Sequence, residues 1–134
     1  METLIERIKR HEGLRFTPYE DSRGNLTLGY GHKLTTPIGR HAALEILRED
    51  VTNAWLQFFR LPAEAIDRLT IKRKEVLVEM TFNLGLNGVR KFRRMLKAME
   101  QSNYDGAADE MLDSRWADQV KSRAIEMADM MREG

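Results

Sequence analysis

Two carboxylic acids, Glu12 and Asp21, lie nine positions apart in positions suited to chemistry. Glu12 falls at the end of a predicted helix, where a carboxylate opposes the helix dipole and gains no stability from it. Asp21 begins a predicted turn. One protonated and one ionised carboxyl group are the usual requirement for glycoside hydrolysis. Spacing alone leaves open that Asp21 only forms its turn, because Asp favours turns and the chain has 21 acidic residues.

A glycine-containing segment with the sequence TLGYGH occupies residues 27–32. It lacks the third glycine and the following helix of a dinucleotide-binding fingerprint, so a nucleotide site is not indicated. Gly29 and Gly31 indicate a sharp bend or a close approach of backbone. His32 has no metal-ligand partners at a suitable spacing, because the other two histidines are scattered along the chain. We therefore expect no metal site, and a carboxylate partner for His32.

A third candidate is the sequence MTFNLG at residues 80–85, where an aromatic and an amide side chain stand next to each other. Sugars stack on aromatic rings and form hydrogen bonds with amides. An aromatic residue on a helix face, however, is commonly part of the core. Position alone favours core for Phe82 and a cleft for Asn83, and both alternatives stay open for Phe82.

The elements that must position these residues follow from periodicity and from turn residues. Residues 4–11 have apolar side chains at helical spacing, and Gly13 is the expected stop. Residues 15–35 are rich in β-favouring side chains around the turn cluster 21–25, which predicts two or three short antiparallel strands. A long helix with one apolar face follows and is broken by Pro62.

The remainder of the chain is predicted to be helical. Thr70 is the expected N-cap of a helix that Gly85 closes, and another helix is expected over residues 89–99. Asp105 is expected to cap a helix that runs to about Leu112, and a final helix covers residues 124–131. The eight methionines are expected to fill the core.

The predicted fold is α+β and predominantly helical, in a single domain of 134 residues. A small sheet lobe at about 13–38 is joined by a long helix at about 39–60 to a helical lobe at about 61–134. The N-terminal helix at 3–12 is expected to belong to the helical lobe, and a cleft to lie between the lobes.

Composition and charge exclude several classes of protein. The chain has 42% hydrophobic residues, no cysteine and no apolar run that could span a membrane, so a disordered chain, disulfides and a membrane span are not expected. Residues 68–97 carry nine basic and two acidic residues, a band that could attract a polyanion or be a solvated helix face. No recognised motif accompanies the band, so nucleic acid is not an expected partner.

Taken together, these motifs resemble the phage-type lysozymes, glycoside hydrolase family 24. The resemblance rests on the order EG, YxD and TxGxGH over residues 12–32, and continues through EDV at 49–51, FNLG at 82–85 and SRW at 114–116. The joint spacing is far more specific than any single piece, and it covers essentially the whole chain. The implied fold is lysozyme-like.

The resemblance implies an endo-acting muramidase that cleaves the β-1,4 bond between N-acetylmuramic acid and N-acetylglucosamine in bacterial peptidoglycan. By that likeness Glu12 is the general acid, while Asp21 and Thr27 position the attacking water for an inverting reaction. No cofactor is implied.

By the same likeness, Lys33, Phe82, Asn83 and Tyr30 are expected to bind substrate, and His32 to pair with Asp50. Lys33 departs from the family, because an apolar cleft residue is expected there. Met95 and Glu110 likewise stand where polar sugar contacts are expected. Few residues separate Thr35 from the long helix, which implies a smaller sheet lobe than in the best-known members.

Residues 1–6 show no secretory signal, so the resemblance implies synthesis in the cytoplasm and action on the wall after release. We expect a monomer without stable membrane association. Two alternatives remain: a lytic transglycosylase, which needs a single acid, and an inactive module that only binds peptidoglycan.

Overall fold

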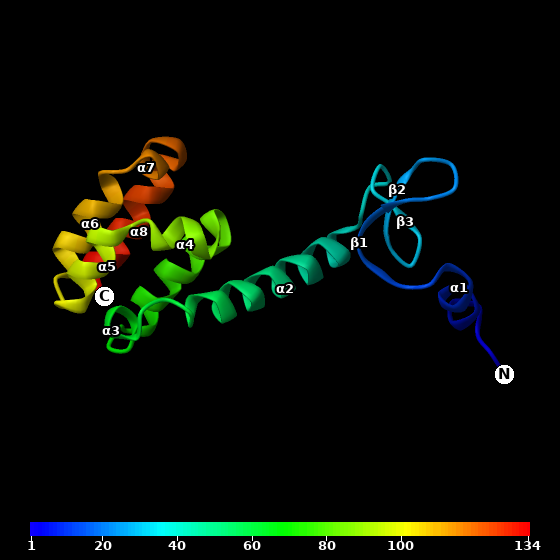
Figure 1. Cartoon of the computed structure of the whole chain (residues 1–134), viewed down its shortest axis with the longest axis horizontal. Coiled ribbons are helices and arrows are strands. Elements are labelled where there is room, and N and C mark those ends of the chain that lie inside the picture. The colour runs from blue at the N-terminus through cyan, green and yellow to red at the C-terminus, as the bar shows by residue number, and fades with distance from the viewer. The chain divides into compact units, whose positions relative to one another are not determined.

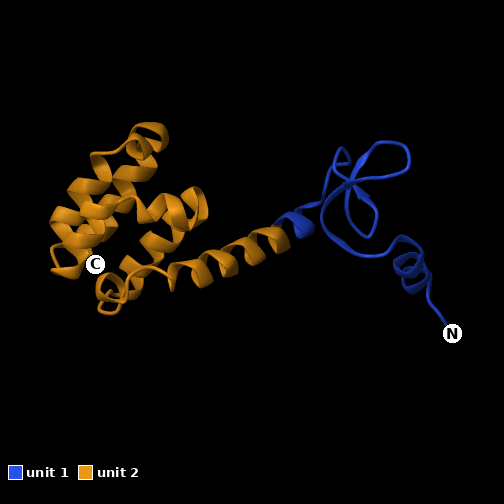
Figure 2. Ribbon diagram, in the orientation of Figure 1, with its two compact units in different colours: residues 1–43 blue, residues 44–134 orange.

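The computed structural model describes all 134 residues, which divide into two compact units, residues 1–43 and residues 44–134 (Figure 2). The first unit contains one helix, the sheet and the first residues of the long helix that follows; the second contains the rest of that helix and the later helices (Figure 1). The α+β, mainly helical class expected from the sequence is confirmed. Whether the N-terminal helix belongs with the helical lobe stays a prediction.

The first unit begins with helix α1, Leu4–Glu12, which is capped as its sequence allows. The Thr3 hydroxyl accepts a hydrogen bond from the Glu6 backbone N–H at 3.1 Å, and the Glu6 carboxylate accepts one from the Thr3 N–H at 2.8 Å. This reciprocal capping box satisfies two donors that the first turn would otherwise leave free. Gly13 ends the helix with φ of 71°, which confirms the predicted stop.

The sheet has three antiparallel strands in the order β1-β2-β3: β1 is Arg15–Glu20, β2 is Leu26–Gly29 and β3 is His32–Lys33. The prediction of a small antiparallel sheet is therefore confirmed. A register irregularity interrupts the pairing of β1 with β2 between Arg15 and Tyr19. Such a bulge bends a strand locally.

Helix α2, Arg40–Phe58, is the long helix that the apolar pattern predicts at 39–60. It ends before Pro62, and α3, Ala63–Ile66, starts directly after that proline. At its C-terminal end Phe58 is fully buried, and its ring packs edge-on against Trp55 at 5.6 Å between ring centroids. Burying one such ring stabilises the fold by about 1.5–3 kcal/mol, which anchors this end of α2 in the second unit.

The remaining helices are α4, Ile71–Arg90; α5, Arg93–Glu100; α6, Tyr104–Leu112; α7, Arg115–Val120; and α8, Ser122–Glu133. Thr70 caps α4 as predicted, since its hydroxyl accepts from the Arg73 N–H at 3.3 Å. Gly85, with φ of 75° and ψ of 165°, breaks the helical geometry and separates two helical stretches within α4, so the predicted end of the Thr70 helix at Gly85 is confirmed.

Two helix starts differ from the prediction. The helix expected over residues 89–99 begins only at Arg93, because Phe92 leaves helical geometry and packs edge-on against Trp116 at 6.1 Å between centroids. Asn103, and not Asp105, caps α6, with its side-chain oxygen accepting from the Gly106 N–H at 2.9 Å. Helix α7 was not predicted at all.

The core of the second unit is built largely from α4, α5, α6 and α8. Methionine is prominent among its fully or almost fully buried side chains: Met80, Met95, Met99, Met111, Met127 and Met131. The unbranched, polarisable thioether fits irregular gaps between helices. The prediction that methionine fills the core is therefore confirmed for most of the eight.

Candidate active site

The turn between β1 and β2 fixes Asp21 at the edge of the sheet. The Asp21 N–H donates to the Asn25 carbonyl at 2.9 Å, and the Gly24 N–H donates to the Asp21 carbonyl at 3.0 Å. Gly24 has φ of 80°, which glycine adopts without a steric penalty. The cluster of turn residues at 21–25 therefore holds the Asp21 backbone rigidly at the end of a strand.

The Asp21 carboxylate is held by the same turn. One oxygen accepts from the backbone N–H groups of Arg23 at 2.9 Å and Asn25 at 2.8 Å. The other accepts from the Asn25 side-chain amide at 3.3 Å. The hydrogen bond from the Asn25 backbone N–H is the main cause of a lowered Asp21 pKa, and partial desolvation opposes it. The bonds from the Arg23 backbone N–H and the Asn25 side chain, and the positive charge of Lys33, lower the pKa further. Asp21 is therefore suited to act as an ionised carboxylate.

Thr27 lies on the central strand β2, opposite Tyr19 on β1 and Lys33 on β3. It is buried, with 3% of its surface exposed, and its hydroxyl donates to the Asn25 carbonyl at 2.9 Å. Because that bond uses the hydroxyl proton, the oxygen lone pairs stay free to accept a hydrogen bond. The residue can therefore orient a water molecule by accepting a hydrogen bond from it.

Asn25 is the residue that sequence reasoning missed. It donates to Asp21 through both its backbone N–H and its side chain, and its carbonyl accepts from Thr27 and from the Asp21 N–H. One turn residue thus ties the carboxylate to the threonine. Its place in the turn cluster was visible, but Asn is so common in turns that the sequence offered no sign of this double role.

Glu12 is the last residue of α1, and its carboxyl group lies against the turn between β2 and β3. A Cβ atom placed on Gly31 would come within 2.8 Å of Glu12 Oε2 and 3.0 Å of Glu12 Cδ. The close backbone approach expected at the glycines of 27–32 is confirmed at Gly31. Lys9 of α1 also approaches this turn, with its Nζ 5.3 Å from the centroid of the Tyr30 ring. Two contacts therefore join α1 to the sheet.

The first unit holds six of the predicted site residues: Glu12, Asp21, Thr27, Tyr30, His32 and Lys33. Lys33 is close enough to Asp21 to lower its pKa, whereas Tyr30 lies in the turn beside Gly31. His32 pairs in register with Leu28. The separation of 6.5–9.5 Å expected between the Glu12 and Asp21 carboxyl groups of an inverting enzyme stays a prediction.

The second unit holds Asp50 on α2 and the pair Phe82 and Asn83 on α4. The Asn83 side-chain oxygen accepts from the Trp116 indole N–H at 2.8 Å, which fixes the orientation of the amide. Phe82 is not part of the buried core of this unit; its neighbour Thr81 is buried instead. Roles for these residues in substrate binding, and the pairing of His32 with Asp50, stay predictions.

A separate hollow of about 540 Å³ in the second unit is lined by Phe92, Trp116, Met95 and Glu110, among others. The two positions at which polar sugar contacts were expected thus share one hollow. No three His, Cys, Asp or Glu side chains come together in a group that could hold a metal ion. None of the helices combines the length and apolar character needed to cross a bilayer.

The family described as phage lysozyme matches this chain over residues 9–128, which is most of its length. The chain belongs to the phage lysozyme family. It is accordingly a glycoside hydrolase of the lysozyme type, as the resemblance implied, and the lysozyme-like fold expected from the sequence is confirmed.

Several relatives carry the same family name or function. A probable T4-type lysozyme of Dictyostelium discoideum is 25% identical over 161 aligned positions, which cover 98% of this chain and 95% of the relative. An endolysin of Acyrthosiphon pisum secondary endosymbiont phage 1 is 31% identical, over 82% of this chain and 74% of the relative. An endolysin of Salmonella phage P22 is 31% identical, over 81% and 77%.

The alignment with the Dictyostelium lysozyme is longer than the 134 residues of this chain, so the relative contains inserted residues. The smaller sheet lobe implied by the few residues between Thr35 and the long helix stays a prediction.

Proposed function

We propose that the chain is an endo-acting muramidase that cleaves the β-1,4 bond between N-acetylmuramic acid and N-acetylglucosamine by inversion. The coarser role, hydrolysis of bacterial peptidoglycan, follows from membership of the phage lysozyme family. The observation that carries the finer proposal is that the first unit contains both carboxyl groups. Asn25 joins the Asp21 carboxylate to Thr27, and the Glu12 carboxyl group lies against Gly31.

In this mechanism Glu12 protonates the glycosidic oxygen as the bond breaks. The attacking water donates one hydrogen bond to Asp21 and one to Thr27, which aligns its oxygen with the anomeric carbon. Asp21 takes the proton that the water loses. The lowered pKa keeps Asp21 ionised for that task, while Thr27 has lone pairs left because its proton is bound to the Asn25 carbonyl.

We further propose that Tyr30, Lys33, Phe82 and Asn83 contact the glycan strand. Lys33 brings a positive charge next to Asp21, and this charge is proposed to face the glycan strand. The Asn83 amide is oriented by Trp116, so its nitrogen has a defined direction for a hydrogen bond. The enzyme is proposed to act as a monomer on the bacterial wall, without a cofactor.

The decisive experiment digests purified peptidoglycan with the chain and reads the reducing ends by mass spectrometry and the anomeric configuration by NMR. Hydrolysis with inversion yields reducing N-acetylmuramic acid whose first-formed anomer is α. A 1,6-anhydro end would instead identify a lytic transglycosylase, and binding without any product would identify an inactive module.

The Glu12→Gln variant tests the acid. The amide cannot donate the required proton, so lysis should stop while the far-ultraviolet circular dichroism stays that of the native chain. The variant should melt no lower than the native chain, and slightly higher if Glu12 is kept at a cost in stability. Native rates of lysis by a folded Glu12→Gln protein would exclude this mechanism.

A further inference from the structure

A hollow of about 520 Å³ on the second unit has four cations among its seven lining residues and contains none of the residues assigned to catalysis. We call it the cationic hollow and define it by its charged lining: Arg60, Arg90, Arg93, Lys97 and Glu100. Arg60 lies between α2 and α3, Arg90 ends α4, and the other three lie on α5 (Figure 1). Four positive charges thus face one carboxylate.

The geometry of α5 explains why three of these side chains share a face. Arg93, Lys97 and Glu100 are separated by four and three positions, which places them along one side of a helix. Arg90 is held at the wall, because its guanidinium donates to the Arg60 carbonyl at 3.3 Å and to the Asn87 side chain at 3.4 Å. Neither bond neutralises its charge.

The cations around the cationic hollow have no ion-pair partner within the second unit. Its ion pairs involve other residues, and all of them use Arg48, Lys72, Arg123 or Arg132. Three further unpaired cations, Arg68, Lys91 and Arg94, lie nearby in sequence on α4, α5 or the segments that flank them. Like charges without counter-ions repel each other and destabilise the fold. An anionic partner would remove this repulsion when it binds.

We propose that the cationic hollow binds a phosphate-bearing polymer of the bacterial cell wall, and this inference rests on the proposed function. Three of its four cations are arginines, whose planar guanidinium groups form paired hydrogen bonds with phosphate oxygens. A chain with repeating phosphates can meet several of them at once. Such a polymer lies in the same layer as the glycan, so binding it keeps the enzyme beside its substrate.

Two other polyanions fit less well. A membrane surface favours exposed aromatic or large apolar side chains that insert into it, and the apolar lining of the cationic hollow consists of Pro62 and a buried Leu96. Nucleic-acid binding usually adds aromatic side chains for stacking or a recognised motif, and this lining has neither.

The test measures binding of the full chain to purified poly(glycerol phosphate) by isothermal titration calorimetry at several salt concentrations. Binding should weaken as salt rises, because salt screens charge–charge attraction. The double variant Arg93→Gln/Lys97→Gln should bind at least roughly tenfold more weakly, since each cation near an anionic surface contributes about 1 kcal/mol, or about fivefold. Neither side chain makes a hydrogen bond that the fold needs.

The matched control is Arg48→Gln/Lys72→Gln, which also removes one arginine and one lysine, but from α2 and α4. It should bind the polymer like the native chain, and thermal melts should show all three proteins folded. Equal weakening in both variants would reduce the effect to net charge and overturn the proposal.

Duplex DNA and vesicles of phosphatidylglycerol are the comparison ligands. Binding of either as tightly as the wall polymer would overturn the choice of partner, and absence of polymer binding would overturn the proposal entirely. The polymer contains no bond that a muramidase cleaves. A failure here therefore leaves the digestion experiment on peptidoglycan unaffected, and the two proposals fail separately.

Discussion

The carboxyl group of Glu12 lies against the backbone of Gly31, so close that a methyl group on Gly31 would come within 2.8 Å of Glu12 Oε2. Helix α1 and the turn between β2 and β3 are therefore in contact at Glu12, the proposed acid. The missing side chain at position 31 is what leaves room for the carboxyl group.

Gly31→Ala should therefore displace Glu12 and reduce the rate of wall lysis by roughly a hundredfold, because small misplacements of a catalytic group are costly. The substitution should also reduce the free energy of unfolding by about 1–2 kcal/mol, because alanine is strained at the positive φ of 80° found at position 31. Gly29→Ala is the matched control, since Gly29 has φ of 68° but a Cβ atom added there would meet no atom within 4 Å. Lysis rates and melting temperatures of both variants are compared. Equal losses of activity would show that backbone strain, and not Glu12, is responsible.

Asp21→Asn should lower the rate of lysis by about 100- to 10,000-fold while the turn persists, because an amide oxygen can still accept from the Arg23 and Asn25 N–H groups. The Asn25 side chain then faces an amide in place of a carboxylate oxygen, which costs part of one weak hydrogen bond. Asp21→Ala should lose activity and the turn together. Activity retained by a folded Asp21→Asn protein would remove Asp21 from the mechanism.

The lowered pKa of Asp21 also predicts how stability depends on pH. A carboxyl group whose pKa is lower in the folded chain contributes stability above its ordinary pKa and loses it as pH falls through the lowered value. The stability difference between the native chain and Asp21→Asn should thus be largest near neutral pH and shrink in acid. Urea unfolding at a series of pH values measures it. A difference that grows in acid would contradict the assigned direction.

Asn25→Ala keeps the backbone bonds to Asp21 and Thr27 but removes the side-chain donor. The pKa of Asp21 should rise towards its ordinary range, so the acid limb of the pH–activity profile should move to higher pH. Ser22→Ala, in the same exposed turn, is the control and should leave the profile in place. A loss of rate at every pH with no movement of that limb would mean that Asn25 acts only on the fold.

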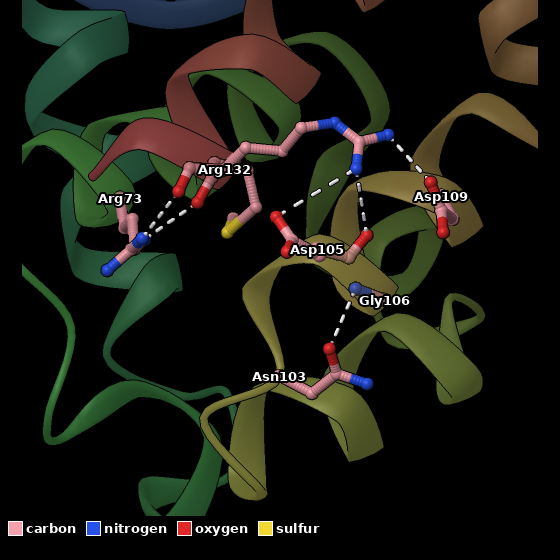
Figure 3. A network of polar contacts seen from close by, with 7 residues as sticks. Arg73, Asn103, Asp105, Gly106, Asp109 and Arg132 are labelled. Carbon is pink, nitrogen blue, oxygen red and sulfur yellow. Dashed lines mark hydrogen bonds and ion pairs between the residues drawn. The ribbon is translucent and has the colours of Figure 1, made fainter.

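Arg73 forms hydrogen bonds with backbone carbonyls in the last turn of α8 (Figure 3). Its guanidinium donates to the carbonyls of Met131 at 2.7 Å and Arg132 at 2.9 Å and lies 3.7 Å from the centroid of the Tyr104 ring. Arg73→Gln should reduce the free energy of unfolding by about 2 kcal/mol, from lost charged hydrogen bonds and the cation–π contact.

The neighbouring Lys72→Gln is the control for Arg73, because it removes only an exposed pair with Glu133 at 3.7 Å and should cost about 0.5 kcal/mol or less. Urea unfolding of both variants gives the comparison, and hydrogen exchange of the α8 amides locates the effect. Similar losses in the two variants would mean that the guanidinium contacts contribute little.

Much of the local structure could be predicted because it depends on neighbours in the sequence. Thr70 caps a helix and Gly13 ends one, since each bond joins groups a few residues apart. The residues proposed for catalysis were also chosen from their order along the chain, through the resemblance to the phage lysozyme family, to which the chain belongs.

Other features depend on groups that folding brings together. Phe92 leaves the helix where its ring meets Trp116, 24 positions later, and no local pattern records that contact. Asn103 caps α6 although Asp105 is an equally good capping residue by type, because only backbone position decides which oxygen reaches the free N–H. The sequence marked Gly31 as a place of close approach. Only the tertiary structure showed that Glu12 is what approaches it, because that contact joins the end of a helix to a turn 19 positions away.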